Sequence, residues 1–143
     1  MPELATVSVI GVFVLAALVI VFMKVRQRDL LGAMLEKRRA SSTLVSRAEY
    51  VEGVERIPVA LSLTRDSLYY ENPDLEASFE LNRLDEIEYS DELTTGIEAH
   101  GCRVLRLRSH GAAFEFLLDK AEAAKWESAL PSRTYGSATA RAV

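Results

Sequence analysis

The chain has 143 residues, a net charge of −4 and one cysteine, which excludes an internal disulfide framework. The charge is unevenly distributed: residues 24–47 hold seven basic and two acidic side chains, a net of +5, whereas residues 48–131 hold eight basic and eighteen acidic ones, a net of −10. So acidic a surface is repelled by phosphate backbones, and we expect no nucleic-acid partner.

Residues 4–23 contain no charged side chain, and thirteen of them are Leu, Ile, Val or Phe. As a helix this segment is about 30 Å long, the thickness of the hydrocarbon core of a bilayer, so we predict a transmembrane helix preceded by a short extracytoplasmic tail, residues 1–3. A buried core helix and a cleavable signal peptide are the alternatives. The start of the chain has no basic residue, and residues 22–24 offer no small-residue cleavage site, which favours an uncleaved anchor.

Basic residues follow the apolar segment at once, and we expect them at the membrane interface. The positive-inside rule then places the N-terminus outside and the rest of the chain in the cytoplasm, at the cell (inner) membrane. Each cation near an anionic leaflet adds about 1 kcal/mol of attraction, although the charge could equally serve topology alone. The interface residues are Lys24, Arg26, Arg28, Lys37, Arg38 and Arg39.

Residues 24–42 are predicted to form a basic juxtamembrane stem and linker. Leu30, Leu31, Met34 and Leu35 recur at helical spacing, so we expect the helix to continue with this face against the headgroups or a partner. The small polar residues 40–43 indicate a connector, and a flexible hinge there would let the following domain move relative to the membrane.

From about residue 43 the apolar period changes to two, which is typical of half-buried antiparallel strands. Two hairpins are predicted, one turning at residues 65–66 and the other at residues 109–111, with a further turn at residues 72–74. The predicted strands are residues 59–64, 67–71, 77–81, 84–89, 103–109 and 112–118.

A helix is predicted after the last strand. Asp119 and Glu122 have the spacing of a capping box, and Pro131 ends the helix. Its apolar stripe is Ala123, Trp126, Ala129 and Leu130. The predicted fold class is therefore α+β: a transmembrane helix, then a domain over residues 43–131 that is a small antiparallel β-barrel or sandwich of six to seven strands capped by this helix. Residues 132–143 are predicted to be a disordered tail.

Residues 59–71, Val-Ala-Leu-Ser-Leu-Thr-Arg-Asp-Ser-Leu-Tyr-Tyr-Glu, and residues 110–116, His-Gly-Ala-Ala-Phe-Glu-Phe, precede a helix that carries Trp126. This arrangement resembles the pleckstrin-homology (PH-like) superfold, in particular GRAM and bacterial PH-like domains. Phosphoinositide-binding members of that family place Lys and Arg in the loop between the first two strands. The matching residues 49–56 contain three glutamates and one arginine, so this activity does not carry over.

Several carboxylates cluster around the fourth predicted strand, residues 84–89. They are either a solvated acidic face or, in the sharper interpretation, a cation site or a docking face for a basic partner; the set is Asp85, Glu86, Glu88, Asp91 and Glu92. Arg103, Arg106 and Arg108 could form a basic patch, but cross-strand pairing with carboxylates is the simpler interpretation.

Catalytic motifs are sparse, and we expect no catalytic, cofactor or metal site. His100, Cys102 and His110 lack the paired spacing of zinc ligands, and no nucleophile elbow or phosphate loop is present. The leading functional hypothesis is a non-enzymatic single-pass membrane protein that presents a PH-like domain to a protein partner, as an accessory or scaffold subunit of a membrane complex. The alternative is a membrane-surface sensor of a lipid headgroup or small ligand.

Overall fold

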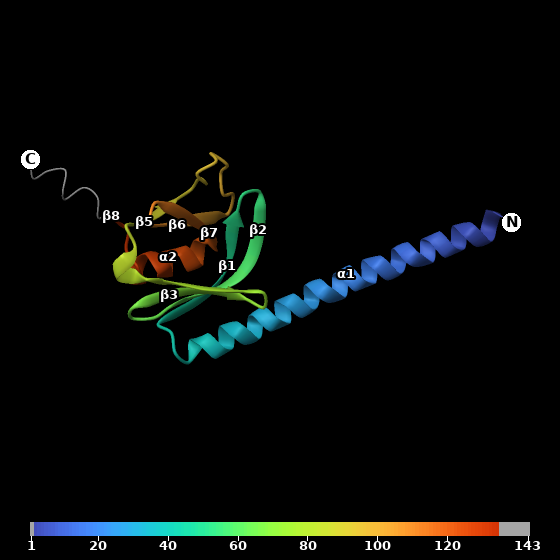
Figure 1. Cartoon of the computed structure of the whole chain (residues 1–143), viewed down its shortest axis with the longest axis horizontal. Coiled ribbons are helices and arrows are strands. Elements are labelled where there is room, and N and C mark those ends of the chain that lie inside the picture. The colour runs from blue at the N-terminus through green and yellow to red at the C-terminus, as the bar shows by residue number, and fades with distance from the viewer. Residues whose placement is uncertain (1, 135–143) are drawn as a thin grey trace, which may run out of the picture.

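The computed structural model describes residues 2–134, with side chains described from residue 8 onward. It consists of one long helix, α1 (Pro2–Arg39), that projects from a small domain of curled sheet (Figure 1). From Ser8 this helix is long and apolar enough to span a membrane, and none of its most apolar stretch is covered by the rest of the protein.

The domain is built from eight antiparallel strands in the order β4-β3-β2-β1-β7-β6-β5-β8, curled into a half-barrel around the helix α2 (Figure 1). The prediction of an α+β fold with an antiparallel sheet and a C-terminal helix is confirmed, although the strand count exceeds the predicted six to seven. The elements are β1 (Leu44–Glu52), β2 (Glu55–Leu63), β3 (Ser67–Asn72), β4 (Leu75–Glu80), β5 (Glu86–Ser90), β6 (Cys102–Ser109), β7 (Ala112–Asp119), α2 (Lys120–Ala129) and β8 (Arg133–Thr134), with a 3₁₀ turn at Leu81–Arg83.

The two predicted hairpins are present. β2 pairs with β3 so that Leu63 lies opposite Leu68, and β6 pairs with β7 so that Ser109 lies opposite Ala112. In the second turn His110 and Gly111 both have positive φ, 51° and 80°, which is the backbone conformation of a type I′ two-residue hairpin turn. A glycine at the second position adopts it without steric cost.

The core lies on the concave face of the sheet, beneath α2. Trp126 and Phe116 are its largest fully buried side chains. Neighbouring aromatic rings pack with centroids 4.8–5.6 Å apart, and they come from both halves of the sheet: Tyr50, Tyr70, Phe79, Phe114 and Phe116. These contacts close the half-barrel, because Phe79 of β4 and Phe114 of β7 are separated by three strands in the sheet order.

The capping box predicted at the start of α2 is wrong. Asp119 makes no side-chain cap hydrogen bond. Glu122 instead accepts a short hydrogen bond from the Ser46 hydroxyl, which itself accepts one of 2.9 Å from the Trp126 indole nitrogen. The carboxylate is thus used to hold α2 against β1. The apolar stripe predicted for α2 is also wrong at Ala129, because this residue is exposed to solvent.

The apolar face of the stem packs on the protein's own sheet. Leu31 and Leu35 are buried with Ala60 of β2, and Met34 and Val45 pack beside them. Because α1 covers the convex side of β2, both faces of that strand are buried from Val59 to Leu63. The expectation that this face meets headgroups or a partner is therefore wrong for Leu31, Met34 and Leu35, whereas Leu30 is 43 % exposed. The flexible hinge at residues 40–43 stays a prediction.

The end of the domain also differs from the prediction. Arg133 and Thr134, expected in a disordered tail, form the two-residue strand β8 against Ile87 and Glu86 of β5. The hydroxyl of Tyr89 donates a 2.7 Å hydrogen bond to the carbonyl of Leu130, which fixes the chain as it leaves α2. The rest of the predicted tail, residues 135–143, lies outside the described residues.

Candidate functional site

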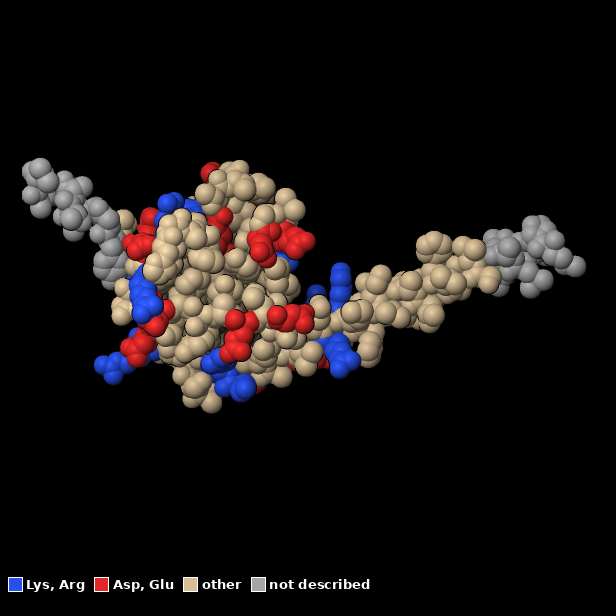
Figure 2. Space-filling model, in the orientation of Figure 1, with Lys and Arg blue, Asp and Glu red and all other residues tan. Residues whose placement is uncertain are grey.

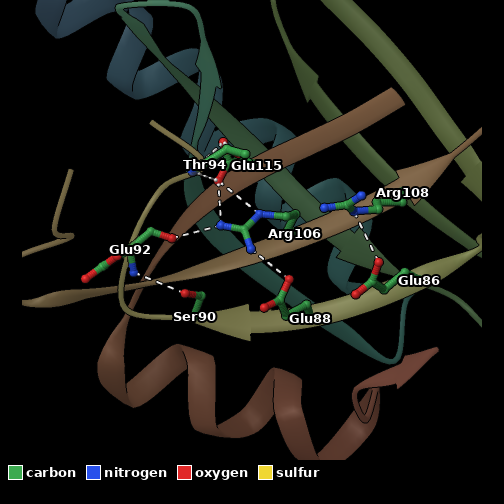
Figure 3. Close-up of polar contacts among 8 residues, drawn as sticks. All are labelled: Glu86, Glu88, Ser90, Glu92, Thr94, Arg106, Arg108 and Glu115. Atoms are coloured by element: carbon green, nitrogen blue, oxygen red, sulfur yellow. Dashed lines mark hydrogen bonds and ion pairs between the residues drawn. The ribbon is translucent and has the colours of Figure 1, made fainter. Parts of the chain in front are cut away.

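The predicted acidic face is the first candidate, and its central carboxylates lie on β5. Strand register sets Glu88 opposite Arg106 and Glu86 opposite Arg108 on β6. The Arg106 Nη1–Glu88 Oε2 distance is 2.7 Å and the Arg108 Nε–Glu86 Oε2 distance is 3.1 Å (Figure 3). Cross-strand pairing, the simpler interpretation, is confirmed for Arg106 and Arg108, whereas Arg103 pairs with Glu127 of α2 at 3.2 Å.

Arg106 is the centre of this network, although its side chain is only 9 % exposed. It also donates to Glu115 of β7 at 3.2 and 3.3 Å and to the backbone carbonyl of Glu92 at 2.9 Å (Figure 3). Burial lowers the pKa of the guanidinium, but the hydrogen bonds to Glu88 and Glu115 outweigh it and leave the pKa raised. A charge so deeply placed is stable only because its donors are satisfied.

Other members of the acidic face are also engaged, with one exception. Asp85 accepts a 3.0 Å hydrogen bond from the backbone nitrogen of His110, and Asp91 lies 3.8 Å from Arg103. The side chain of Glu92 is exposed and makes no ion pair within the described residues. Much of the predicted face is therefore a self-neutralised network, and its most available negative charge is at residues 91–92.

The loop between β5 and β6 extends this available edge. Leu93 and Ala99 are buried with Val104 and Leu117 in a second small core on the convex face of the sheet. This packing anchors the loop and leaves Ile97 56 % exposed. The acidic loop edge, which we define as Asp91, Glu92, Ile97 and Glu98, thus offers an apolar side chain among carboxylates.

The six predicted interface cations fall into two groups along α1. Lys24, Arg26 and Arg28 are exposed where α1 leaves the domain, and Figure 2 shows basic side chains there with a tan apolar helix beyond them. Lys37, Arg38 and Arg39 are about 20 Å further along the helix axis, beyond the roughly 8 Å screening length of physiological salt. For an anchor perpendicular to the membrane, only the first group reaches the headgroups.

Arg38 is occupied in a joint between α1 and the sheet. Its guanidinium donates to the Glu71 carboxylate at 2.7 and 3.2 Å and lies 4.6 Å from the ring centroid of Tyr69. The hydrogen bond to Glu71 is the main reason why the pKa of Arg38 is raised. Glu71 was not identified from the sequence as the partner of Arg38. The signal that could have pointed to it was a lone carboxylate that follows Leu68, Tyr69 and Tyr70 near the end of the strand.

The remaining candidates from the sequence, His100, Cys102 and His110, are not brought together in one site. His100 is exposed with Glu98 3.8 Å away, Cys102 is half-buried beside the second core, and His110 occupies the β6–β7 turn. Over the part of the chain that the structure describes, no three His, Cys, Asp or Glu side chains are grouped as metal ligands. The absence of catalysis stays a prediction.

Comparison with known proteins gives no relative: no family model, no curated protein and no solved structure matches the chain.

Proposed function

We propose that this chain is a non-enzymatic, single-pass membrane protein that presents its sheet domain, a PH-like fold, to a protein partner at the cytoplasmic face of the cell membrane. In this role it acts as an accessory or scaffold subunit of a membrane complex. The observation that carries the proposal is the combination of an uncovered apolar helix with a domain packed firmly onto its end.

The apolar surface of α1 requires a cover that the chain does not supply. From Val9 to Val25 its large apolar side chains are each at least half exposed. Exposed apolar area costs about 25 cal/mol per Å² in water, and a bilayer removes that cost along the whole segment. Lys24, Arg26 and Arg28 at its end support a cytoplasmic domain through the positive-inside rule.

The acidic loop edge supports a protein partner. It combines Ile97 with the exposed carboxylates of Asp91, Glu92 and Glu98, of which only Asp91 has an arginine of β6 nearby, at 3.8 Å. The edge is held on a packed loop. An interface core needs an apolar anchor and a charged rim, so the complementary partner surface is an apolar pocket edged by Lys or Arg.

Photocrosslinking in intact membranes tests this docking role. A photoreactive residue at Ile97 should give one recurrent crosslinked protein, whereas the same residue at Asn82, exposed in the 3₁₀ turn, should not. Recovery of the uncrosslinked monomer alone from both positions would remove the acidic loop edge as a docking surface. Carbonate washing and protease protection of the same membranes separately test the anchor and its orientation.

A second candidate, the membrane-surface sensor, is favoured by one specific feature. A basic groove lies between α1 and the start of β2, next to the apolar segment.

A further inference from the structure

We propose that the groove between α1 and the start of β2 binds the phosphoryl headgroup of an anionic glycerophospholipid. The inference rests on the membrane anchoring proposed above, because it places the groove at the level of the headgroups. The proposal gives Lys24 and Arg28, which the sequence analysis placed only generally at the membrane interface, a defined site and a ligand class.

The groove has a volume of about 490 Å³ and three walls. One face of α1 supplies the first wall, because Lys24, Gln27, Arg28 and Leu31 recur at the i, i+3, i+4, i+7 spacing that lines up side chains on a helix. The other two walls are residues 56–58 at the start of β2 and residues 72–74 in the β3–β4 turn. The same helical face continues to Leu35, so the packing on Ala60 fixes the groove's first wall.

Hydrogen bonds fix the position of the other two walls. The side-chain amide of Asn72 donates to the carbonyl of Pro58 at 3.3 Å, and the amide oxygen of Asn72 accepts from the backbone nitrogen of Asp74 at 2.9 Å. The β3–β4 turn is thereby tied to β2. The groove is pre-formed, and a ligand that enters it does not have to order these segments.

Three cations converge on the groove from two elements. Lys24, Arg28 and Arg56 are all exposed, and none of them makes an ion pair within the described residues. In contrast, the arginines of the Glu71 joint and of β6 all have carboxylate partners. Residues 48–131 carry a net charge of −10, yet their Arg56 lies beside Lys24 and Arg28 of α1 without an ion pair in the described residues. Three cations placed together in this way indicate an anionic ligand.

The remaining groove residues narrow the ligand class. Leu31 and Ile57 add apolar surface beside the cations, which suits the glycerol end of a lipid better than a fully hydrated anion. Asp74 adds one carboxylate, which disfavours a second negative charge on the ligand and favours a phosphodiester. The three glutamates of residues 49–56, which oppose headgroup capture in the sequence, do not line the groove.

Lipid binding by the full-length chain in neutral detergent tests the site. Native mass spectrometry would compare retention of phosphatidylglycerol with that of phosphatidylcholine of the same acyl chains. We expect selective retention of phosphatidylglycerol, and Arg28→Gln or Arg56→Gln should each weaken it about tenfold, the loss of one charge-assisted contact. The two variants should keep the wild-type melting temperature, since neither side chain makes an ion pair in the described structure.

Two variants remove the same charge outside the groove. Arg26→Gln is two residues from Arg28 on the same helix but does not line the groove, and Arg65→Gln lies beyond the other end of β2. Equal losses in these controls, or equal retention of the two lipids by the wild type, would overturn the proposal. Displacement of phosphatidylglycerol by excess inorganic phosphate would overturn the lipid assignment in favour of a soluble phosphate.

The failure of the groove and the failure of the anchor give different results. Carbonate washing of membranes that contain the wild type reports on the anchor alone. Membrane retention without phosphatidylglycerol selectivity rejects the groove and leaves the proposed function standing, whereas release by carbonate rejects the anchor.

Discussion

The guanidinium of Arg38, at the end of α1, donates two hydrogen bonds to the carboxylate of Glu71 on β3, which is almost fully buried. Together with the packing of Leu31 and Leu35 on Ala60, this pair joins α1 and the domain into one packed unit. The joint is therefore the first feature to test.

Arg38→Gln should loosen the end of α1. The substitution leaves the buried Glu71 carboxylate without its cation, at a cost of about 2 kcal/mol. Hydrogen–deuterium exchange of the full chain in detergent should show faster exchange over residues 29–39. Arg39→Gln is the matched control, because its partner is the exposed Glu36 at 3.0 Å, and it should exchange as the wild type does. Identical protection in the two variants would refute the joint.

Leu35→Ala should weaken the same joint through packing. Truncating a buried leucine costs about 2–5 kcal/mol where the cavity cannot collapse, and Leu35 is 6 % exposed against β2. Leu30→Ala, five residues earlier and on the exposed side of α1, should cost far less. Limited proteolysis near residues 40–43 would measure the difference, and equal cleavage rates would contradict the packing.

Arg106→Met should be the most destabilising substitution in the β5–β7 network. It leaves Glu115, 12 % exposed, without its cation, and breaking such a buried pair costs about 3 kcal/mol. Arg108→Met removes a pair whose arginine is 49 % exposed and should cost less than about 1 kcal/mol. Thermal unfolding of the two variants in detergent compares them. A larger loss for Arg108→Met would show that the network does not centre on Arg106.

Glu122 should make stability depend on pH in the acidic range. The hydrogen bond from Ser46, followed by that from Lys125, lowers the pKa of Glu122 below its ordinary 4.5. A lowered pKa in the folded state stabilises the fold above pH 4.5 and loses this effect as the pH falls through the folded value. Glu122→Gln should therefore be less stable than the wild type near neutral pH, and the difference should shrink on acidification. A difference that is constant with pH would show that the charge is not involved.

The sequence predicted the concave face of the sheet well, because local alternation specifies it. Val59, Leu61 and Leu63 face the core as their spacing indicates. Cross-strand pairing of the β6 arginines with carboxylates was also expected, although the specific partner Glu88 of Arg106 depends on the strand register. β1 was not delimited by the prediction, since Ser46 is a polar residue on its buried face and breaks the pattern.

Features that depend on distant segments could not be predicted in this way. Ala60 and Ser62 are buried only because α1 covers the convex face of β2, and no local period records that cover. The partners Glu71 for Arg38 and Glu115 for Arg106 likewise lie on strands whose position relative to them is set by the fold. The groove beside Lys24 could not be predicted from local patterns either, because some of its walls are more than forty residues apart in the sequence.

Because α1 runs without a break from the apolar segment into its seat on β2, it acts as a lever arm for the domain. Transmembrane helices tilt by about 20° on average and change tilt with bilayer thickness. If α1 spans the membrane as proposed, any such change would swing the sheet through the same angle and raise or lower the acidic loop edge above the lipid. In that arrangement the protein would convert membrane thickness into the height of the proposed docking surface.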